Sequence, residues 1–436
     1  MPTAILINPY IYDFAACDLF AKPLSLIKLA DWLARRGYDV IFWDLLNPLD
    51  KEITSFMKSN PRIKIGKRQK YSRGTFHSEI CMKPDVLKNV PRHFRRYGAN
   101  REYLEKLLKN VSFKPDIVCI CITMTYWYLS AGEIVELVRG YFADAAFILG
   151  GNYIRLCNDH ARKMFPDCIL YNEQDFDNLK NYIHLREPDM NMKRLRLYEN
   201  LVYMPLQTST GCFNKCPYCA SSILYPEMRQ FEIAEVMDDF RFYQENYGNL
   251  DIAFYDDVLL HDFNTHLKII LEEILKTGYN AMMHTPNGLQ VNLIDDNVAE
   301  WLKRANFGYI RLSLESSVPY WQKESDSKVD NTHFIDAVKA LHKAGYEKDD
   351  IGVYLLIGLP GQKAKDVTEA VSFVKENGAT ARFSEYSPVP GTPYFRYEAE
   401  AFPQIVDEPL FQNCSLMAYR NREFDYETLE DLKRLL

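Results

Sequence analysis

The sequence lacks any long apolar segment. No stretch of its 436 residues reaches the roughly 18 consecutive apolar residues that a membrane-spanning helix needs. The opening residues, MPTAILINPYIYDF, have neither the basic start nor the apolar run of a secretion signal. We therefore expect a cytoplasmic protein with no membrane partner.

An excess of positive charge is also missing, because the net charge is −7 and the pI is near 5.8. The molecule as a whole is not expected to bind nucleic acid. One segment differs: residues 51–110 carry 16 Lys or Arg against five Asp or Glu. Two interpretations stay open for this basic insertion, a solvated and partly helical excursion or a surface for a phosphate-bearing substrate or RNA.

The cysteines do not form the pattern of a disulfide framework. Several lie inside apolar runs, as Cys119 and Cys121 do within residues 117–122, which is typical of reduced thiols that fill a core. The scattered residues are Cys17, Cys81, Cys119, Cys121, Cys157, Cys168 and Cys414. The other three cysteines lie within eight residues of one another and need a separate explanation.

The first part of the chain alternates between short apolar strands and helices. Helical periodicity is present at about 24–36 and 130–142. Strands are expected at 4–8, 38–43, 116–122, 146–149 and 168–171. Residues 1–185 are therefore predicted to form a flavodoxin-like, Rossmann-like doubly wound α/β domain, interrupted by the insertion at about 51–110.

A second run of alternation follows a polar linker at 186–200. Strands are expected at 202–207, 252–255, 281–285, 309–314, 351–357 and 381–386. Six strand–helix units fit a partial (β/α)6 barrel of TIM type over residues 201–400, with reactive residues at the strand carboxyl ends. Residues 401–436 are too short for a domain and are expected to form a C-terminal cap.

Directly after the first of these strands stands Gly-Cys-Phe-Asn-Lys-Cys-Pro-Tyr-Cys, residues 211–219. Cysteine is rare enough here that this C-x3-C-x2-C spacing arises by chance in roughly one such chain in two hundred. Thiolates suit iron–sulfur clusters or zinc. No fourth Cys or His lies nearby, so Cys212, Cys216 and Cys219 would leave one coordination position open for chemistry; a zinc site with a distant fourth ligand is the alternative.

This loop resembles the signature of the radical SAM superfamily. The resemblance implies a [4Fe–4S] cluster on Cys212, Cys216 and Cys219 whose open iron binds S-adenosyl-L-methionine and releases a 5′-deoxyadenosyl radical. It also implies an electron donor such as a reductase, flavodoxin or ferredoxin.

Further positions match the family's cofactor-binding sites. Tyr218 stands at an aromatic position near the adenine, and Asp256 and Asp257 stand where the family binds an amino group, although an aspartate there can instead cap a helix. Asn287 can bind cofactor or simply form a turn, and Lys328 can steady a carboxylate or be an ordinary surface lysine. Ser313 and Glu315 are expected to share one face of a strand, and Gly358 lets the backbone approach the adenine.

The order of the two domains resembles the B12-binding-domain class of radical SAM proteins. Residues at predicted strand ends are candidates for holding a corrinoid: Thr123, Tyr126, Gly150 and Gly151. The Asp-x-His-x-x-Gly motif that supplies a cobalt ligand in many B12 proteins is absent, and no His precedes His77. A purely structural domain therefore stays open as an alternative.

We predict a radical SAM enzyme that is linked to cobalamin and transfers a methyl group to an unactivated centre of an unknown substrate. The alternatives are another radical reaction, a non-catalytic iron–sulfur or corrinoid sensor, and a methylthiotransferase acting on tRNA, which would need a second cluster in the N-terminal domain.

Overall fold

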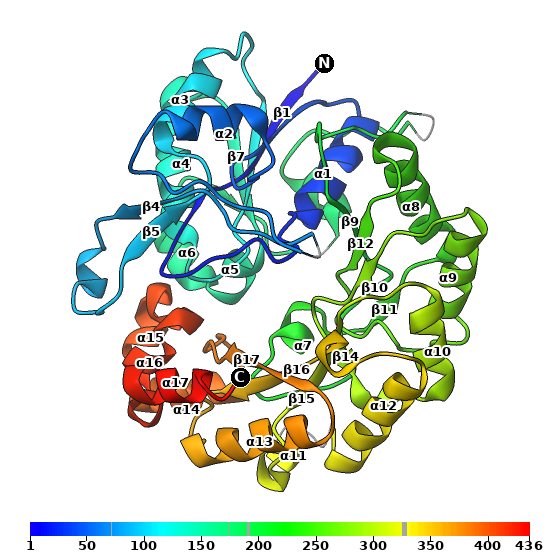
Figure 1. The fold of residues 1–436 in the computed structure, drawn as a ribbon. Helices are drawn as coiled ribbons and strands as arrows, with labels where there is room; N and C mark the ends of the chain where they lie inside the picture. The colour runs from blue at the N-terminus through cyan, green and yellow to red at the C-terminus, as the bar shows by residue number, and fades with distance from the viewer. Residues whose placement is uncertain (71, 174, 190–191, 325–328) are drawn as a thin grey trace. The chain divides into compact units, whose positions relative to one another are not determined.

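A computed structural model describes residues 1–436 except 71, 174, 190–191 and 325–328. Contacts divide the chain into two compact units (Figure 1). The N-terminal unit comprises 1–201 and 404–413, and the barrel unit comprises 202–403 and 414–436. No helix among the described residues is both long and apolar enough to cross a membrane.

The N-terminal unit is built around a five-stranded parallel sheet of order β3-β1-β6-β7-β8. These strands are β1 (Thr3–Asn8), β3 (Asp39–Asp44), β6 (Ile117–Cys121), β7 (Ala146–Gly150) and β8 (Ile169–Leu170). The helices are α1 (Leu24–Arg35), α2 (Lys51–Lys58), α3 (Arg101–Lys109), α4 (Tyr128–Tyr141), α5 (Asn152–Leu156), α6 (Asn158–Met164) and α15 (Gln404–Asp407).

The strand order confirms the predicted flavodoxin-like doubly wound fold. The chain runs outward from β1 to β3 and then returns to the other side of β1 with β6, which creates a switch point between β1 and β6. Strand β1 is buried along its whole length, and Ala4 and Leu6 pack with Leu29, Ala30 and Leu33 of α1. The apolar face of α1 therefore closes one side of the sheet.

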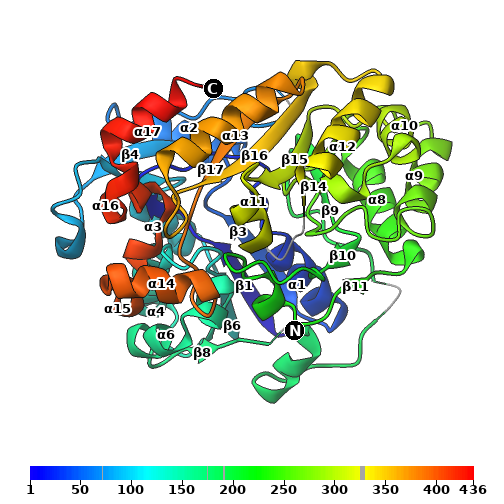
Figure 2. The ribbon, with the colours of Figure 1, turned by 90° about the horizontal axis from the view of Figure 1, so that it is seen from below.

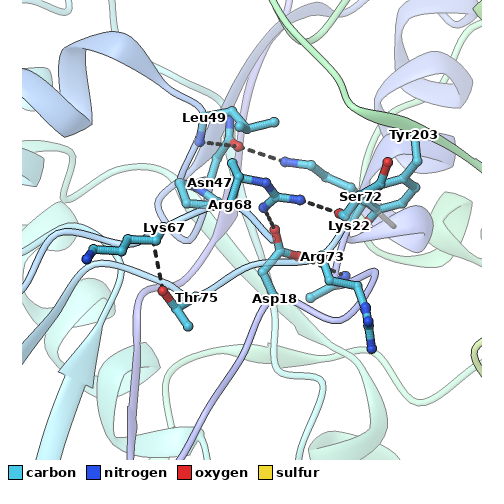
Figure 3. Close-up of polar contacts among 12 residues, drawn as sticks. Asp18, Lys22, Asn47, Leu49, Lys67, Arg68, Ser72, Arg73, Thr75 and Tyr203 are labelled. Carbon is cyan, nitrogen blue, oxygen red and sulfur yellow. Dashed lines mark hydrogen bonds and ion pairs between the residues drawn. The ribbon is translucent and has the colours of Figure 1, made fainter. Parts of the chain in front are cut away.

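The basic insertion is more ordered than the sequence indicated. It contributes β4 (Ser78–Cys81) and β5 (Phe94–Tyr97), which form an antiparallel sheet with β2 (Ile11–Asp13) in the order β2-β5-β4. The basic side chain of Arg68 holds part of it in place, because it donates hydrogen bonds to the Asp18 carboxylate and to the Ser72 carbonyl, as Figure 3 shows. The expectation of helix is met by α2 and α3, but the strands were not foreseen.

A buried ion pair lies at the carboxyl end of β3. Lys22 Nζ is 3.2 Å from Asp44 Oδ2 and donates to Asn47 Oδ1 at 2.9 Å, the second contact being visible in Figure 3. Tyr198 and Asn8 also donate to the Asp44 carboxylate. This network ties residues before β9 to the N-terminal sheet, because Tyr198 lies only a few residues before the barrel unit begins.

The barrel unit has parallel strands on the inside and helices on the outside, which can be followed in Figure 2. The strands are β9 (Tyr203–Leu206), β10 (Ser209–Thr210), β11 (Arg229–Gln230), β12 (Asp251–Phe254), β13 (Met283–His284), β14 (Leu289–Gln290), β15 (Ile310–Glu315), β16 (Ile351–Ile357) and β17 (Thr380–Glu385). The helices are α7 (Ser221–Leu224), α8 (Ile233–Tyr247), α9 (Leu267–Lys276), α10 (Asp296–Arg304), α11 (Pro319–Glu324), α12 (Asn331–Lys343), α13 (Ala364–Glu376), α14 (Pro393–Ala401), α16 (Met417–Arg420) and α17 (Tyr426–Lys433).

The predicted partial barrel is confirmed, with an interruption in its middle. Strands β9, β12 and β13 form one parallel sheet and β14 to β17 form another. A single parallel bridge between Met283 and Phe307 connects β13 to the chain just before β15. The third predicted strand is reduced to two residues, so the carboxyl ends near β13 and β14 are formed by loop rather than by regular sheet.

Candidate functional site

The three clustered cysteines lie in one loop at the carboxyl end of β9. Strands β10 and β11 pair in an antiparallel ladder, Ser209 with Gln230 and Thr210 with Arg229, and so close the base of this cysteine loop, residues 211–228. Gly211 has a φ of +81°, and a Cβ there would lie 2.8 Å from the Glu227 carbonyl oxygen. Glycine is thus required immediately before Cys212 because the two ends of the loop pass so close to each other.

The sulfur atoms receive hydrogen bonds from the loop. The Asn214 backbone N–H donates to Cys212 Sγ, and the Ser221 N–H donates to Cys219 Sγ, each at 3.4 Å. All three thiols are free of disulfides, and Cys216 is buried. Within the described parts of the chain, no three Cys, His, Asp or Glu side chains are gathered closely enough to hold a metal ion.

Asp256 holds the entrance to the cysteine loop. Its carboxylate is 3% exposed and accepts hydrogen bonds from the Thr208 N–H at 3.0 Å and from the Thr208 and Ser209 hydroxyls, both at 2.7 Å. Burial raises the pKa of this carboxyl, and the hydrogen bonds oppose that shift. The sequence predicts Asp256 at an amino-group site, and in the structure its oxygens accept hydrogen bonds from Thr208 and Ser209.

Asp257 holds the same loop at a point just after its last cysteine. Its Oδ2 accepts a hydrogen bond from the Ser221 hydroxyl at 2.8 Å, and Ser221 begins α7 two residues after Cys219. Burial raises the pKa of Asp257. The two adjacent aspartates after β12 therefore fix both ends of the segment that carries the cysteines.

Tyr218 lies inside the loop beside the cysteine sulfurs. Its hydroxyl is buried, and burial, together with the nearby Glu315 and Cys216, raises its pKa. Its ring packs with a cluster that includes Tyr386 and Tyr394. The phenol therefore keeps its proton and can act only as a neutral group.

The side-chain amide nitrogen of Asn287 is bonded to the backbone at the end of β12. Its Nδ2 donates to the Tyr255 carbonyl at 3.2 Å and to the Asp256 carbonyl at 3.1 Å. This side chain therefore ties the β13–β14 connection to the end of β12. It also steadies the backbone of Asp256, whose carboxylate bonds Thr208 and Ser209.

The alternation predicted along β15 is interrupted. The register against β16 shifts between Ser313 and Glu315, and Glu315 has a φ of +67°. A β-bulge at this point re-aims the following side chain, so the two residues do not share a face through simple i, i+2 spacing. Ser313 is buried, and Glu315 is close enough to Tyr218 to affect its pKa.

Gly358 allows a close approach, but by another part of the same chain. A Cβ there would lie 2.0 Å from Met417 Sδ of α16, and the φ is +84°. Its N–H donates to Gln362 Oε1 at 2.8 Å. The glycine is explained by this packing, and Lys328, the remaining candidate, lies outside the described residues.

One residue that the sequence did not indicate lies beside the loop. Gln290 of β14 is 4% exposed, and its Nε2 donates to Cys212 Sγ at 3.9 Å. Nothing in its local sequence, Gly-Leu-Gln-Val-Asn, distinguishes it from a strand residue on a polar face. The one feature that could have pointed to Gln290 is that it is a polar residue close to the end of a predicted barrel strand.

The carboxyl edge of the N-terminal sheet is partly open and partly used. Thr123 is exposed, and a Cβ on Gly150 would meet only the Tyr171 carbonyl oxygen, at 3.9 Å. Tyr126 is buried, and Gly151, with a φ of +101°, allows close contact with the Ile122 backbone. Of the four residues predicted at this edge, Thr123 and Gly150 are therefore the ones that face an approachable surface.

Residues of the 404–413 segment also use this edge. Asn413 donates to the buried Asp13 carboxylate at 2.8 Å, and Trp127 Nε1 donates to the other oxygen at 2.7 Å. Tyr128 donates to Glu408 at 2.8 Å. These side chains are committed to the fold of the N-terminal unit.

Comparison with known proteins gives a family match over the middle of the chain. Residues 206–374 match the model of the radical SAM superfamily. The chain is 27% identical over 230 residues to bacteriochlorophyllide d C-12(1)-methyltransferase of Chlorobaculum tepidum, covering 50% of this chain and 48% of that protein. It is 25% identical over 242 residues to tRNA-2-methylthio-N(6)-dimethylallyladenosine synthase of Clostridium novyi, covering 51% of each. The chain thus spans about half the length of these curated relatives.

Solved structures share the fold over nearly the whole chain. The methyltransferase TsrM from Kitasatospora setae, solved with cobalamin and a [4Fe–4S] cluster bound, matches with a TM-score of 0.61 at 14% identity, covering 92% of this chain and 75% of that one. The cobalamin-dependent radical enzyme OxsB matches with a TM-score of 0.51 at 13% identity, covering 94% and 56%. At this identity the likeness concerns the fold.

Proposed function

Residues 206–374 form a radical SAM domain, and from this premise we propose that the chain is a radical SAM enzyme whose cluster is held by Cys212, Cys216 and Cys219. The observation that carries the proposal is the loop itself. It places three cysteines that form no disulfide at the carboxyl end of β9, where barrel enzymes keep their reactive groups.

The donor set of the loop fits a [4Fe–4S] cluster. Three soft thiolates bind three irons and leave the fourth iron for S-adenosylmethionine, and N–H groups directed at sulfur are typical of cluster sites. In this proposal the sulfurs converge when the cluster is built, while the β10–β11 ladder and the two aspartates keep both ends of the loop fixed.

A cluster held by these cysteines would supply one electron for the cleavage of a C–S bond of S-adenosylmethionine into methionine and a 5′-deoxyadenosyl radical. The chain's own residues orient and enclose this chemistry. Cys216 is buried, the phenol of Tyr218 stays protonated, and Asp256 keeps β9 and β12 in register at the edge where the cofactor binds. A reductase, flavodoxin or ferredoxin would deliver the electron, in a cytoplasm that keeps the thiols reduced.

Methyl transfer linked to cobalamin is the reaction we favour. The fold likeness to a cobalamin-binding methyltransferase and the relative that methylates a bacteriochlorophyllide support it. A flat corrinoid could rest on the exposed Thr123 and on the Gly150 backbone at the carboxyl edge of the sheet, where it would supply the methyl group.

The thiols of the N-terminal unit do not favour methylthio transfer, which would require a second cluster. Burial raises the pKa of Cys119 and of Cys157 to about 12, and that of Cys121 to about 11. Thiols that hold their protons so strongly are poor metal ligands. Cys119 also packs within the apolar core against α1.

The first test is anaerobic reconstitution with iron and sulfide, followed by reduction in the presence of S-adenosylmethionine. We expect up to about four irons per chain, as the stoichiometry of one [4Fe–4S] cluster requires, and formation of 5′-deoxyadenosine. The Cys212→Ala, Cys216→Ala, Cys219→Ala triple variant should lose both the iron and the product.

A matched control is the Cys119→Ala, Cys157→Ala variant, which removes two thiols from the N-terminal unit only. It should keep the full iron content. Iron that stays in the triple variant, or a normal loading that yields no 5′-deoxyadenosine with any reductant, would refute the assignment of these cysteines to a reactive cluster.

A second test concerns the corrinoid. We expect purified protein incubated with hydroxocobalamin and passed through a desalting column to retain the corrinoid bands in its visible spectrum. The Gly150→Phe variant should lose most of this retention, because its ring would cover the surface beside Thr123. Equal retention by the variant would place the corrinoid elsewhere, and no retention by the wild type would favour a structural domain.

A further inference from the structure

We propose that Gln290 joins the cluster to its ligand: its amide N–H groups bond the Cys212 sulfur, and its amide oxygen accepts a hydrogen bond from an N–H of the amino group of S-adenosylmethionine. This inference rests on the proposed function, because it requires the cofactor at the open iron. No role was expected for this residue from the sequence.

The position of Gln290 meets the first requirement. It is the last residue of β14 and pairs in register with Ser313 of β15, so it lies inside the barrel. Its side chain is 4% exposed, and Nε2 reaches Cys212 Sγ at 3.9 Å. A group on a β-strand is held more firmly than one on the loop, so Gln290 can orient Cys212 from outside.

The amide oxygen of Gln290 supplies the second observation. Among the described residues nothing donates a hydrogen bond to its buried Oε1. Exchanging the amide oxygen and nitrogen would not remove the difficulty, because the oxygen would then face an electron-rich sulfur. A buried acceptor left without a donor is costly, so this atom calls for a ligand with N–H groups.

The predicted acceptors for an amino group are already bonded to the chain, fully in the case of the buried Asp256 and at one oxygen in the case of Asp257. Asp256 receives hydrogen bonds from Thr208 and Ser209, and Asp257 receives one from Ser221. Gln290 Oε1 is buried next to a cluster ligand and has no such partner. The Thr285 hydroxyl, in the connection that leads to β14, is likewise buried without a partner and can assist.

The test compares Gln290→Leu and Gln290→Glu with the wild type after reconstitution. Gln290→Leu removes both contacts at nearly constant volume, and we expect normal iron content with S-adenosylmethionine binding about tenfold to a hundredfold weaker, as for the loss of one buried hydrogen bond. Binding is measured by titrating the reduced cluster with S-adenosylmethionine and recording the concentration at which half of the EPR signal has changed to that of the cofactor-bound form. The midpoint potential should become more negative, because an N–H···S bond stabilises the reduced cluster.

Gln290→Glu separates the two contacts. It keeps an acceptor for the amino group but loses the donor to sulfur, so we expect the lowered potential with near wild-type cofactor binding. If Gln290→Leu fails to retain iron, this variant decides the matter, and an unchanged potential in it overturns the proposal.

Gln244→Leu on α8 is the control, since the exposed contact of Gln244 Nε2 with the Thr277 hydroxyl involves no residue of the cysteine loop, so neither the binding nor the potential should change. An unchanged half-conversion concentration in iron-loaded Gln290→Leu overturns the proposed contact with the cofactor. A wild type that holds no cluster, or whose EPR spectrum does not respond to S-adenosylmethionine, refutes instead the proposed function on which this inference rests.

Discussion

Replacing Asp256 by alanine is expected to lower the free energy of unfolding by about 3 kcal/mol or more, since three buried donors lose their acceptor at about 1–3 kcal/mol each. These donors are the Thr208 N–H and the hydroxyls of Thr208 and Ser209. The entrance to the cysteine loop then loses its anchor, so iron retention after reconstitution should fall well below that of the wild type. Urea unfolding and iron analysis of the desalted protein measure the two effects.

The matched control is Asp238→Ala on α8. The Asp238 side chain is 73% exposed, and among the residues that the structure describes it pairs only with Arg241, one turn away on the same helix. Such exposed pairs contribute about 0–1 kcal/mol, so stability and iron content should barely change. If Asp256→Ala unfolds and retains iron as Asp238→Ala does, the carboxylate is not an anchor of the loop.

Replacing Arg420 by methionine is expected to destabilise the barrel unit by about 3–5 kcal/mol, the usual cost of leaving one partner of a buried ion pair alone. Arg420 Nε lies 3.1 Å from Glu398 Oε1, and the two side chains are 1% and 8% exposed. Arg420 also donates to the Tyr386 carbonyl at 3.3 Å, just after β17. Thermal unfolding monitored by circular dichroism should show a clearly lower midpoint.

The double variant Glu398→Gln, Arg420→Met tests the cause of this loss. Removing both charges avoids the isolated buried carboxylate, so the double variant should be more stable than Arg420→Met alone. Arg241→Met, which breaks an exposed pair, provides the baseline. A double variant that is less stable than the single one would mean that packing by Arg420, rather than its charge, supports the unit.

The elements that could be predicted from the sequence are those with a strong local pattern, such as buried strands, the helices that cover them, and closely spaced ligands. Strand β1 is buried at every position, and the apolar pattern of α1 ends at Gly37, whose φ is +84°. The cysteine loop was recognisable because three ligands of one kind stand close together in the chain. Local signals were sufficient in each of these cases.

Features that depend on distant partners were missed. Strands β4 and β5 are only four residues long each, and β5 also pairs with β2, far back in the chain. Gly358 was predicted as a site for a cofactor, which stays a prediction, but the packing of Met417 against it was not foreseen. The residue type of Asp256 was informative, but its role depends on Thr208 and Ser209, which the fold alone brings to it.

The segment 404–413 gives the molecule an unusual order of assembly. The N-terminal unit buries Asp13 against Asn413 and completes the environment of Tyr128 with Glu408, yet these partners belong to the end of the chain. When residue 201 leaves the ribosome, the first unit still lacks part of its own surface. Its assembly is finished only after residues 202–403 of the barrel unit have been synthesised, so the first unit to begin folding completes its surface late.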